Sequence, residues 1–371
     1  MVVKIALYSA AFMKKIKILD WPTQRFYCET HPFYRWKEQL KERGYEVKCY
    51  HNHLHKELKD ADYLIIHSRY FNPGWQSIHD RNQQNEEELI AYLLQIKNVN
   101  GKLIWFDAAD SSGSSDFPII SFVDVFLKKQ ILQDKEYYTN PHANNHKLRV
   151  WIEDDDSGSS SFKPCPVNQL HKIKAGWNLG LNDYRYFGYK LSRLSNYLNY
   201  SLYPLKFSQV VDTRPLDLTF RGNLRYEDGG RDKVSEQRNK VLTYLRNVSM
   251  NVASGPVIPK KSYWKELRNA KICISPFGWG EVCYRDFESF ISGALLIKPS
   301  MEHLTTYPDM YVANETYIPV KWNLDDLPEK LEQVKDNFSD FKHIAIQGQE
   351  RYKKAVNDPE TFINTLLSAI A

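Results

Sequence analysis

Short apolar runs alternate with amphipathic stretches through the first half of the chain. The strand candidates there are 2–8, 15–19, 46–50, 62–67, 102–106 and 123–127. Helical periodicity is expected over 33–43, closed by Gly44, and over 82–97. Strands that are apolar along their whole length and alternate with helices are typical of parallel sheets covered on both faces. The pattern therefore predicts a doubly wound α/β domain.

The alternation begins again after an irregular stretch. Strands are expected over 216–220, 272–274, 294–297 and 317–320, and helices over 235–246, 263–269, 327–336, 340–354 and 359–370. A further helix is expected over 188–199, and 204–215 reads as a linker. We therefore predict one domain over 1–205, a second over 206–355, and a C-terminal helix within 356–371.

The stretch 273–299 carries the strongest candidate chemistry. It reads as a strand, a loop containing Gly278 and Gly280, a helix from about Glu281 to Gly293, and a second buried strand. Gly293 suits the left-handed position that ends a helix. A glycine-bearing turn before a helix N-terminus presents free backbone N–H groups to an anion such as a phosphate.

One face of that expected helix is charged. At about 100° per residue, Glu281, Arg285 and Glu288 fall on a narrow strip, with Tyr284 between it and an apolar face. The strip can point a cation and two carboxylates at the mouth of the loop. The alternative is a row of solvated ion pairs that stabilises the helix by a few tenths of a kcal/mol.

These residues resemble a known signature. Arg285-x-x-Glu288-x-x-x-x-Gly293 followed by an apolar strand is similar to the donor site in the C-terminal domain of GT-B glycosyltransferases. The resemblance implies two Rossmann-like doubly wound domains that face each other across a cleft. It also implies that Glu288 holds donor hydroxyls, that the loop and basic residues hold the diphosphate, and that a C-terminal helix crosses back to the first domain.

The match departs from the commonest retaining pattern, which has glutamates eight positions apart. Here the residue eight positions before Glu288 is Gly280, and Glu281 lies seven positions before it. An arginine three residues before the glutamate is more similar to several inverting families. The resemblance therefore favours inversion, weakly.

Further basic residues are candidates for the donor site. Arg221 and Arg225 follow the expected strand 216–220, and Lys261 belongs to a basic pair before the helix 263–269. The guanidinium group can hold two phosphate oxygens, which suits this corner of a sheet. The alternative for each is an ordinary solvated basic side chain.

An Asp/Ser-rich loop, 107–116, supplies the candidate acceptor side. It directly follows the strand 102–106, and ligands of open α/β sheets bind beyond the carboxyl ends of strands. A carboxylate there can accept the proton of an acceptor hydroxyl. Asp110 is the first candidate base, Asp107 the second and His31 the third. The alternative is a turn that only caps the next helix.

Composition limits the partners. The chain has 371 residues, 42% hydrophobic, and a net charge of +5, which fits an anionic small ligand but does not argue for nucleic acid. Five scattered cysteines without zinc spacing indicate reduced thiols in a cytoplasmic protein. The histidines at 51, 53 and 55 lack partners at ligand spacing, so neither a metal nor a cofactor is expected.

The sequence thus predicts a metal-independent glycosyltransferase that moves a sugar from a nucleotide-activated donor to a hydroxyl of a glycan or glycolipid, as in surface polysaccharide assembly. An epimerase acting on nucleotide sugars is the alternative enzyme. A non-catalytic protein that binds glycans or nucleic acid is the third reading, and nucleic acid is the less expected partner. No run is long and apolar enough to span a bilayer, and peripheral contact with the inner face of a membrane stays open.

Overall fold

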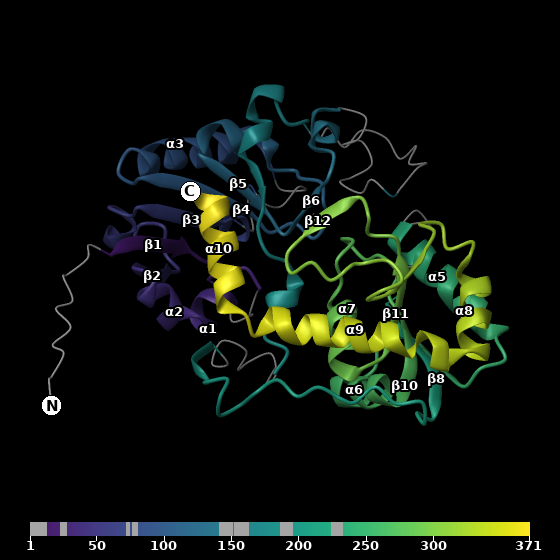
Figure 1. Cartoon of the computed structure of the whole chain (residues 1–371). Coiled ribbons are helices and arrows are strands. Elements are labelled where there is room, and N and C mark those ends of the chain that lie inside the picture. Colours follow the sequence, from purple (N-terminus) through teal and green to yellow (C-terminus); the bar gives the residue numbers. More distant parts are fainter. Residues whose placement is uncertain are drawn as a thin grey trace, which may run out of the picture.

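The chain folds into two α/β lobes (Figure 1). The computed structural model describes residues 13–22, 28–71, 75, 81–140, 151, 163–185, 196–223 and 233–371. The expected strand 2–8, most of the expected helix 188–199, and Arg225 lie outside these residues.

The first lobe is built on a six-stranded parallel sheet with the order β2-β1-β3-β4-β5-β7. Its strands are β1 (Lys14–Leu19), β2 (Tyr45–Tyr50), β3 (Tyr63–His67), β4 (Lys102–Asp107), β5 (Val125–Lys128) and β7 (Ile173–Ala175). Every residue of β3 and β5 is buried, as expected for strands covered on both faces.

Helices cover this sheet nearly where the sequence predicts them. They are α1 (His31–Arg35), α2 (Lys37–Glu42) and α3 (Gln83–Lys97). The single helix expected over 33–43 is interrupted at Trp36, whose backbone leaves the helical region at φ −112° and ψ 29°. Trp36 is buried, and its ring contacts Phe362 near the end of the chain. Tertiary packing thus divides a helix that local periodicity would continue.

The second lobe contains a five-stranded parallel sheet with the order β13-β11-β10-β8-β9. Its strands are β8 (Leu216–Arg221), β9 (Val252–Gly255), β10 (Ala270–Ile274), β11 (Leu295–Pro299) and β13 (Ile318–Val320). Its helices are α5 (Lys233–Arg246), α6 (Lys260–Asn269), α7 (Tyr284–Ser292), α8 (Leu327–Asp336) and α9 (Phe338–Val356). The predicted pair of parallel, Rossmann-like sheets is confirmed.

The lobes are joined by more than the linker. A short strand of the first lobe, β6 (Gln130–Leu132), pairs antiparallel with β12 (Leu304–Thr306) of the second. The long helix α9 then leads back across the molecule to α10 (Pro359–Ile370), which lies on the first lobe (Figure 1). None of the helices that the structure describes is long and apolar enough to cross a membrane.

Phe362 anchors α10. Its ring is fully buried among Phe33, Trp36 and Trp177, with ring centroids 4.9–5.9 Å apart. These three partners all belong to the first lobe, so the last helix of the chain completes the core of the first domain.

We expect Phe362→Ala to lower the free energy of unfolding by about 3–5 kcal/mol, because it removes a buried ring and leaves a cavity. Denaturant unfolding followed by tryptophan fluorescence measures the change. Ser368→Ala, an exposed position of the same helix, is the matched control. Equal stability of the two variants would contradict the assigned role of α10.

Candidate functional site

A cavity of about 710 Å³ lies between the lobes. The first lobe contributes Asp110, Leu179, Asn182, Asp183 and Tyr184. The second lobe contributes Arg221, Arg238, Val257, Ile258, Lys260, Tyr263, Pro276, Gly278, Trp279, Gly280, Val282, Cys283, Tyr284, Arg285 and Glu288. Most of this second set follows the carboxyl ends of β8, β9 and β10, where open α/β sheets bind ligands.

The Gly-rich loop and α7 form the floor of the cavity. The helix begins at Tyr284, three residues later than predicted, because the buried carboxylate of Asp286 accepts a hydrogen bond from the backbone N–H of Cys283 at 2.9 Å. The same carboxylate accepts from Tyr311 at 2.7 Å and lies 3.2 Å from the ammonium of Lys298. Gly293 ends the helix at φ +68°, as the sequence predicts.

Two of the predicted donor-binding side chains lie together on α7. Arg285 donates from Nη2 to the backbone carbonyl of Arg221 at 2.6 Å, and its guanidinium carbon lies 5.1 Å from the centroid of the Phe220 ring. Glu288 accepts from the Tyr263 hydroxyl at 2.7 Å. Burial raises the pKa of Glu288 above its ordinary value. Both side chains line the cavity together with Tyr284.

Arg221 lines the cavity, but most of its donors are in use. Its Nε and Nη2 each lie 2.8 Å from a carboxylate oxygen of Glu266, and Nη1 donates to the carbonyl of Ser254 at 2.6 Å. Of the predicted basic pair, Lys260 lines the cavity, whereas Lys261 is exposed and does not. The lysine that faces the cavity is therefore the neighbour of the one that the sequence singled out.

Glu281 takes a different position from the one predicted. It precedes α7 and is therefore not on the helical face of Arg285 and Glu288. Its fully buried carboxylate accepts from the backbone N–H of Ser112 at 2.9 Å and from the Ser112 hydroxyl at 2.7 Å. Burial raises the pKa of Glu281 above its ordinary value. It links the two lobes and does not line the cavity.

Gly280 permits the closest approach between the lobes. A Cβ atom at this position would lie 1.6 Å from the carbonyl oxygen of Asp110. No residue larger than glycine therefore fits here unless the loop moves. A Cβ at Gly278 would lie no closer than 3.5 Å to any neighbour, an ordinary contact. The two glycines of the loop therefore have different roles.

Asp110 is the one of the three candidate bases that lines the cavity. Its side chain is 43% exposed, and its Oδ1 lies 2.8 Å from Nζ of Lys129 and 3.4 Å from Nη2 of Arg69. Partial burial opposes ionisation of Asp110, but the charges of Lys129 and Arg69 outweigh it and hold the pKa below its ordinary value. The carboxylate is therefore ionised at neutral pH.

The other two candidate bases are buried and do not line the cavity. Asp107 is buried, paired with Nζ of Lys128 at 2.8 Å and with the Ser114 hydroxyl at 2.5 Å. His31 is also buried, and its ring nitrogens lie 3.0 Å from Oδ1 of Asn196 and 2.8 Å from the Tyr200 hydroxyl. Burial lowers the pKa of His31 to about 4. Both residues occupy structural positions, and neither lines the cavity.

The loop after β7 lines the cavity but was not predicted from the sequence. Asn182, Asp183 and Tyr184 face the donor side from the first lobe, and Asp183 is held by Arg185 through a hydrogen bond from Nη2 at 2.8 Å. The signal was present, because a loop that follows a parallel strand lies at the ligand-binding edge of the sheet. The strand itself, Ile173–Ala175, is too short for periodicity to detect.

Within the described part of the chain, no group of three His, Cys, Asp or Glu side chains is placed to hold a metal ion. Of the loop histidines, His53 is bonded to the Tyr70 hydroxyl and His55 caps a short helical turn. Independence from metal and cofactor stays a prediction.

Neither a model of a known protein family nor a curated protein sequence matches the chain. It is similar to a solved alpha-glucosyltransferase in complex with UDP-glucose and DNA containing an abasic site, with 9% identity and a TM-score of 0.48 over 96% of this chain and 99% of that one. It is also similar to T4 phage BGT in complex with UDP-glucose, with 13% identity and a TM-score of 0.46 over 96% and 99% of the two chains. TarM matches with 9% identity and a TM-score of 0.43 over 85% of this chain and 56% of its own. Likenesses this distant carry no argument about the site, so we argue its function from its own residues.

We expect Gly280→Ala to disrupt the site, because the added methyl group must push the loop away from the Asp110 carbonyl. Gly278→Ala is the matched control in the same loop and should keep the wild-type stability, because a Cβ there makes only ordinary contacts. Thermal unfolding and nucleotide binding measure both effects. A Gly280→Ala protein with wild-type stability and binding would show that the lobes do not meet here.

Proposed function

We propose that the chain transfers a sugar from a nucleotide-diphosphate donor, bound in the cavity between the lobes, to a hydroxyl group of an acceptor. The observation that carries the proposal is the division of the cavity walls by charge. The second lobe supplies four basic side chains, Arg221, Arg238, Lys260 and Arg285, and one carboxylate, Glu288, whereas the first lobe supplies Asp110 and Asp183. A diphosphate fits the basic wall, and a hydroxyl to be deprotonated fits the acidic one.

The backbone of the second lobe supports a diphosphate in the same place. Helices α6 and α7 begin at Lys260 and Tyr284, and both residues line the cavity. Helix N-termini carry partial positive charge and unpaired N–H groups that favour phosphate oxygens. Together with the fixed guanidinium groups they can stabilise the charge that develops on a departing diphosphate. We therefore propose transfer without a divalent metal.

Glu288 and Tyr263 are the proposed site for donor hydroxyls. They lie beside the basic wall and already form a hydrogen bond at 2.7 Å. The second carboxylate oxygen of Glu288 can accept from a sugar or ribose hydroxyl. A carboxylate acceptor binds such a group more strongly than a neutral one.

Asp110 is the proposed base. In this scheme the acceptor oxygen forms a bond to the anomeric carbon while the bond from that carbon to the diphosphate breaks. The acceptor proton passes to the carboxylate of Asp110, and the electron pair leaves with the diphosphate. Lys129 and Arg69 make Asp110 a weak base, so it acts best on a proton that is already leaving in the transition state. Direct displacement of this kind inverts the anomeric centre. We propose a glycan or glycolipid as the acceptor.

We expect Arg285→Ala to weaken nucleoside diphosphate binding by about 10- to 100-fold, the value of one hydrogen bond to a charged group. Isothermal titration with UDP, GDP and ADP measures the loss of affinity and identifies the nucleobase of the donor. Arg268→Ala is the control, since that arginine is exposed on α6 and does not line the cavity. Undiminished binding by Arg285→Ala would refute the donor assignment.

We expect Asp110→Asn to lose about 10²- to 10⁴-fold in transfer rate, because the amide cannot accept the proton. Nucleotide affinity should stay at the wild-type value, because Asp110 lies on the acidic wall. This result would distinguish the role of the acidic wall from that of the basic wall. Turnover assays with the donor identified by titration, with and without acceptor glycans, measure the rate. Full activity of the variant would exclude this base, and epimerised donor formed without acceptor would favour an epimerase instead.

A further inference from the structure

The chain exposes four large apolar side chains just before the linker. Tyr197, Leu198, Leu202 and Tyr203 are 74%, 42%, 83% and 53% exposed. We call these four residues the apolar tip. Single exposed apolar side chains are ordinary, but four within seven residues form a patch of the kind that marks an interaction site.

A row of basic side chains lies on α6. Lys261, Lys265 and Arg268 are exposed and follow the i, i+4, i+7 spacing that places them on one face of the helix. None of the three forms an ion pair with any residue that the structure describes. We call these three residues the basic row. Lys206, exposed in the linker, lies between it and the apolar tip in the sequence.

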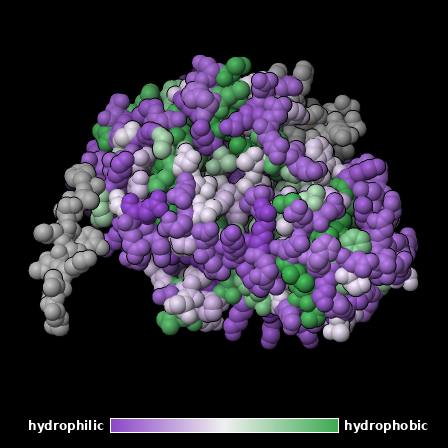
Figure 2. Space-filling model, in the orientation of Figure 1, coloured by the Kyte–Doolittle hydropathy of each residue, from purple (hydrophilic) through white to green (hydrophobic). Residues whose placement is uncertain are grey.

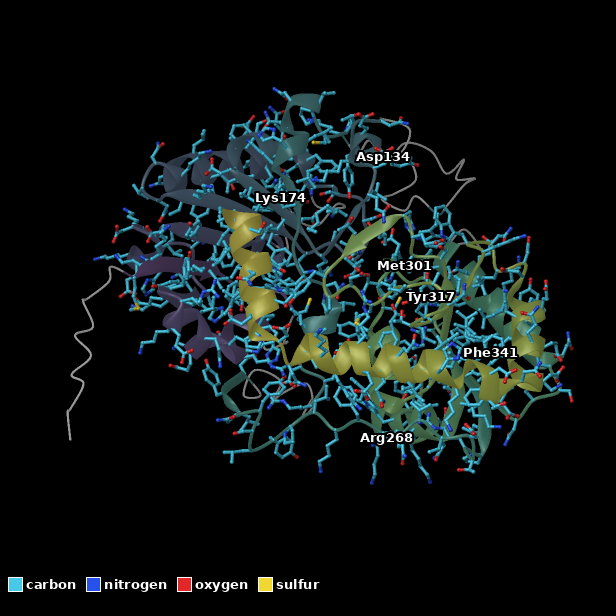
Figure 3. All side chains as sticks on the ribbon, viewed as in Figure 1. Asp134, Lys174, Arg268, Met301, Tyr317 and Phe341 are labelled. Atoms are coloured by element: carbon cyan, nitrogen blue, oxygen red, sulfur yellow. The ribbon has the colours of Figure 1, made fainter. Side chains whose placement is uncertain are left out.

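The stretch that carries the apolar tip and the helix that carries the basic row lie on the same side of the molecule. In Figure 1 the teal stretch around residue 200 and the helix α6 both lie along the lower edge, and the linker runs between them. Figure 3 places Arg268 at that edge, pointing outward. Figure 2 shows hydrophobic and hydrophilic surface along the same edge.

We propose that this face docks the protein on an anionic lipid surface. Lysine and arginine side chains attract anionic headgroups, tyrosine rings favour the boundary between headgroups and acyl chains, and leucine side chains enter the apolar layer. Charge alone would also suit a nucleic acid. The two leucines decide against it, because a phosphate backbone offers them nothing to contact.

Docking in this orientation places the cavity close to the lipid surface. Lys260 and Tyr263 of α6 line the cavity, while the basic row lies on the exposed face of the same helix. A lipid-linked acceptor held at this surface would therefore lie one helix away from the cavity. This consequence rests on the proposed function, whereas the docking surface does not.

The test is co-sedimentation of the full chain with vesicles of phosphatidylcholine alone or mixed with phosphatidylglycerol. We expect binding to the anionic vesicles that weakens as salt rises. Lys265→Glu combined with Arg268→Glu should weaken it by about 25-fold or more, at about fivefold for each basic residue lost. Leu202→Ser combined with Tyr203→Ser should also weaken it, and at high salt this variant should show the larger defect.

Val167→Ser combined with Lys174→Glu is the matched control. It removes one exposed apolar and one exposed basic side chain seven residues apart, and Figure 3 places Lys174 in the upper part of the molecule. Control and wild type should bind alike. Wild-type affinity in the basic-row variant would overturn the proposal, as would a wild-type protein that binds a DNA duplex but not anionic vesicles. Nucleotide titration of the same variants should be unchanged, so failure of docking leaves the proposed function intact.

Discussion

The contact between the Gly-rich loop and the Asp/Ser-rich loop determines the geometry of the site. Gly280 lies against the Asp110 carbonyl, and the next residue, Glu281, holds the backbone and hydroxyl of Ser112. A buried carboxylate is tolerated only when hydrogen bonds replace the water it has lost. This contact therefore sets the distance between the basic wall and the acidic wall. The β6–β12 pairing supports the same closed arrangement.

The charged side chains of the cavity are held in place before any ligand binds. Glu266 fixes the guanidinium of Arg221, the carbonyl of Arg221 fixes Arg285, and Lys129 fixes Asp110. Side chains restrained in this way lose little freedom on binding and need not reorganise as charge develops in a transition state. The restraint also reduces the basicity of Asp110. The site is thus better suited to stabilise charge with fixed side chains than to remove a proton with a strong base.

The sequence was sufficient for those features that depend on local pattern. Apolar runs located most strands of both sheets, and Gly278, Gly280 and Gly293 located the loop and the end of α7. The position of Glu281 could not be predicted, because the start of α7 depends on Asp286, whose partners Lys298 and Tyr311 are distant in sequence. Helical periodicity therefore assigned Glu281 to the helix, although it belongs to the loop before α7.

The candidate bases show the same limit. Asp107 and Asp110 belong to one loop and have the same chemistry, but consecutive lysines separate their roles. Lys128 forms a buried ion pair with Asp107, whereas Lys129 pairs with Asp110 at the cavity. Only the three-dimensional structure reveals which lysine meets which carboxylate. The loop 176–185 was missed because its strand has three residues, too few for a pattern.

Hydrogen exchange in the presence of nucleoside diphosphates tests the central claim most directly, since it locates the ligand on the chain. The account predicts added protection of backbone amides in 276–288 and at the start of α6, with little change in 107–116 until an acceptor is also bound. Protection confined to the first lobe, or binding with no protection of the Gly-rich loop, would contradict it.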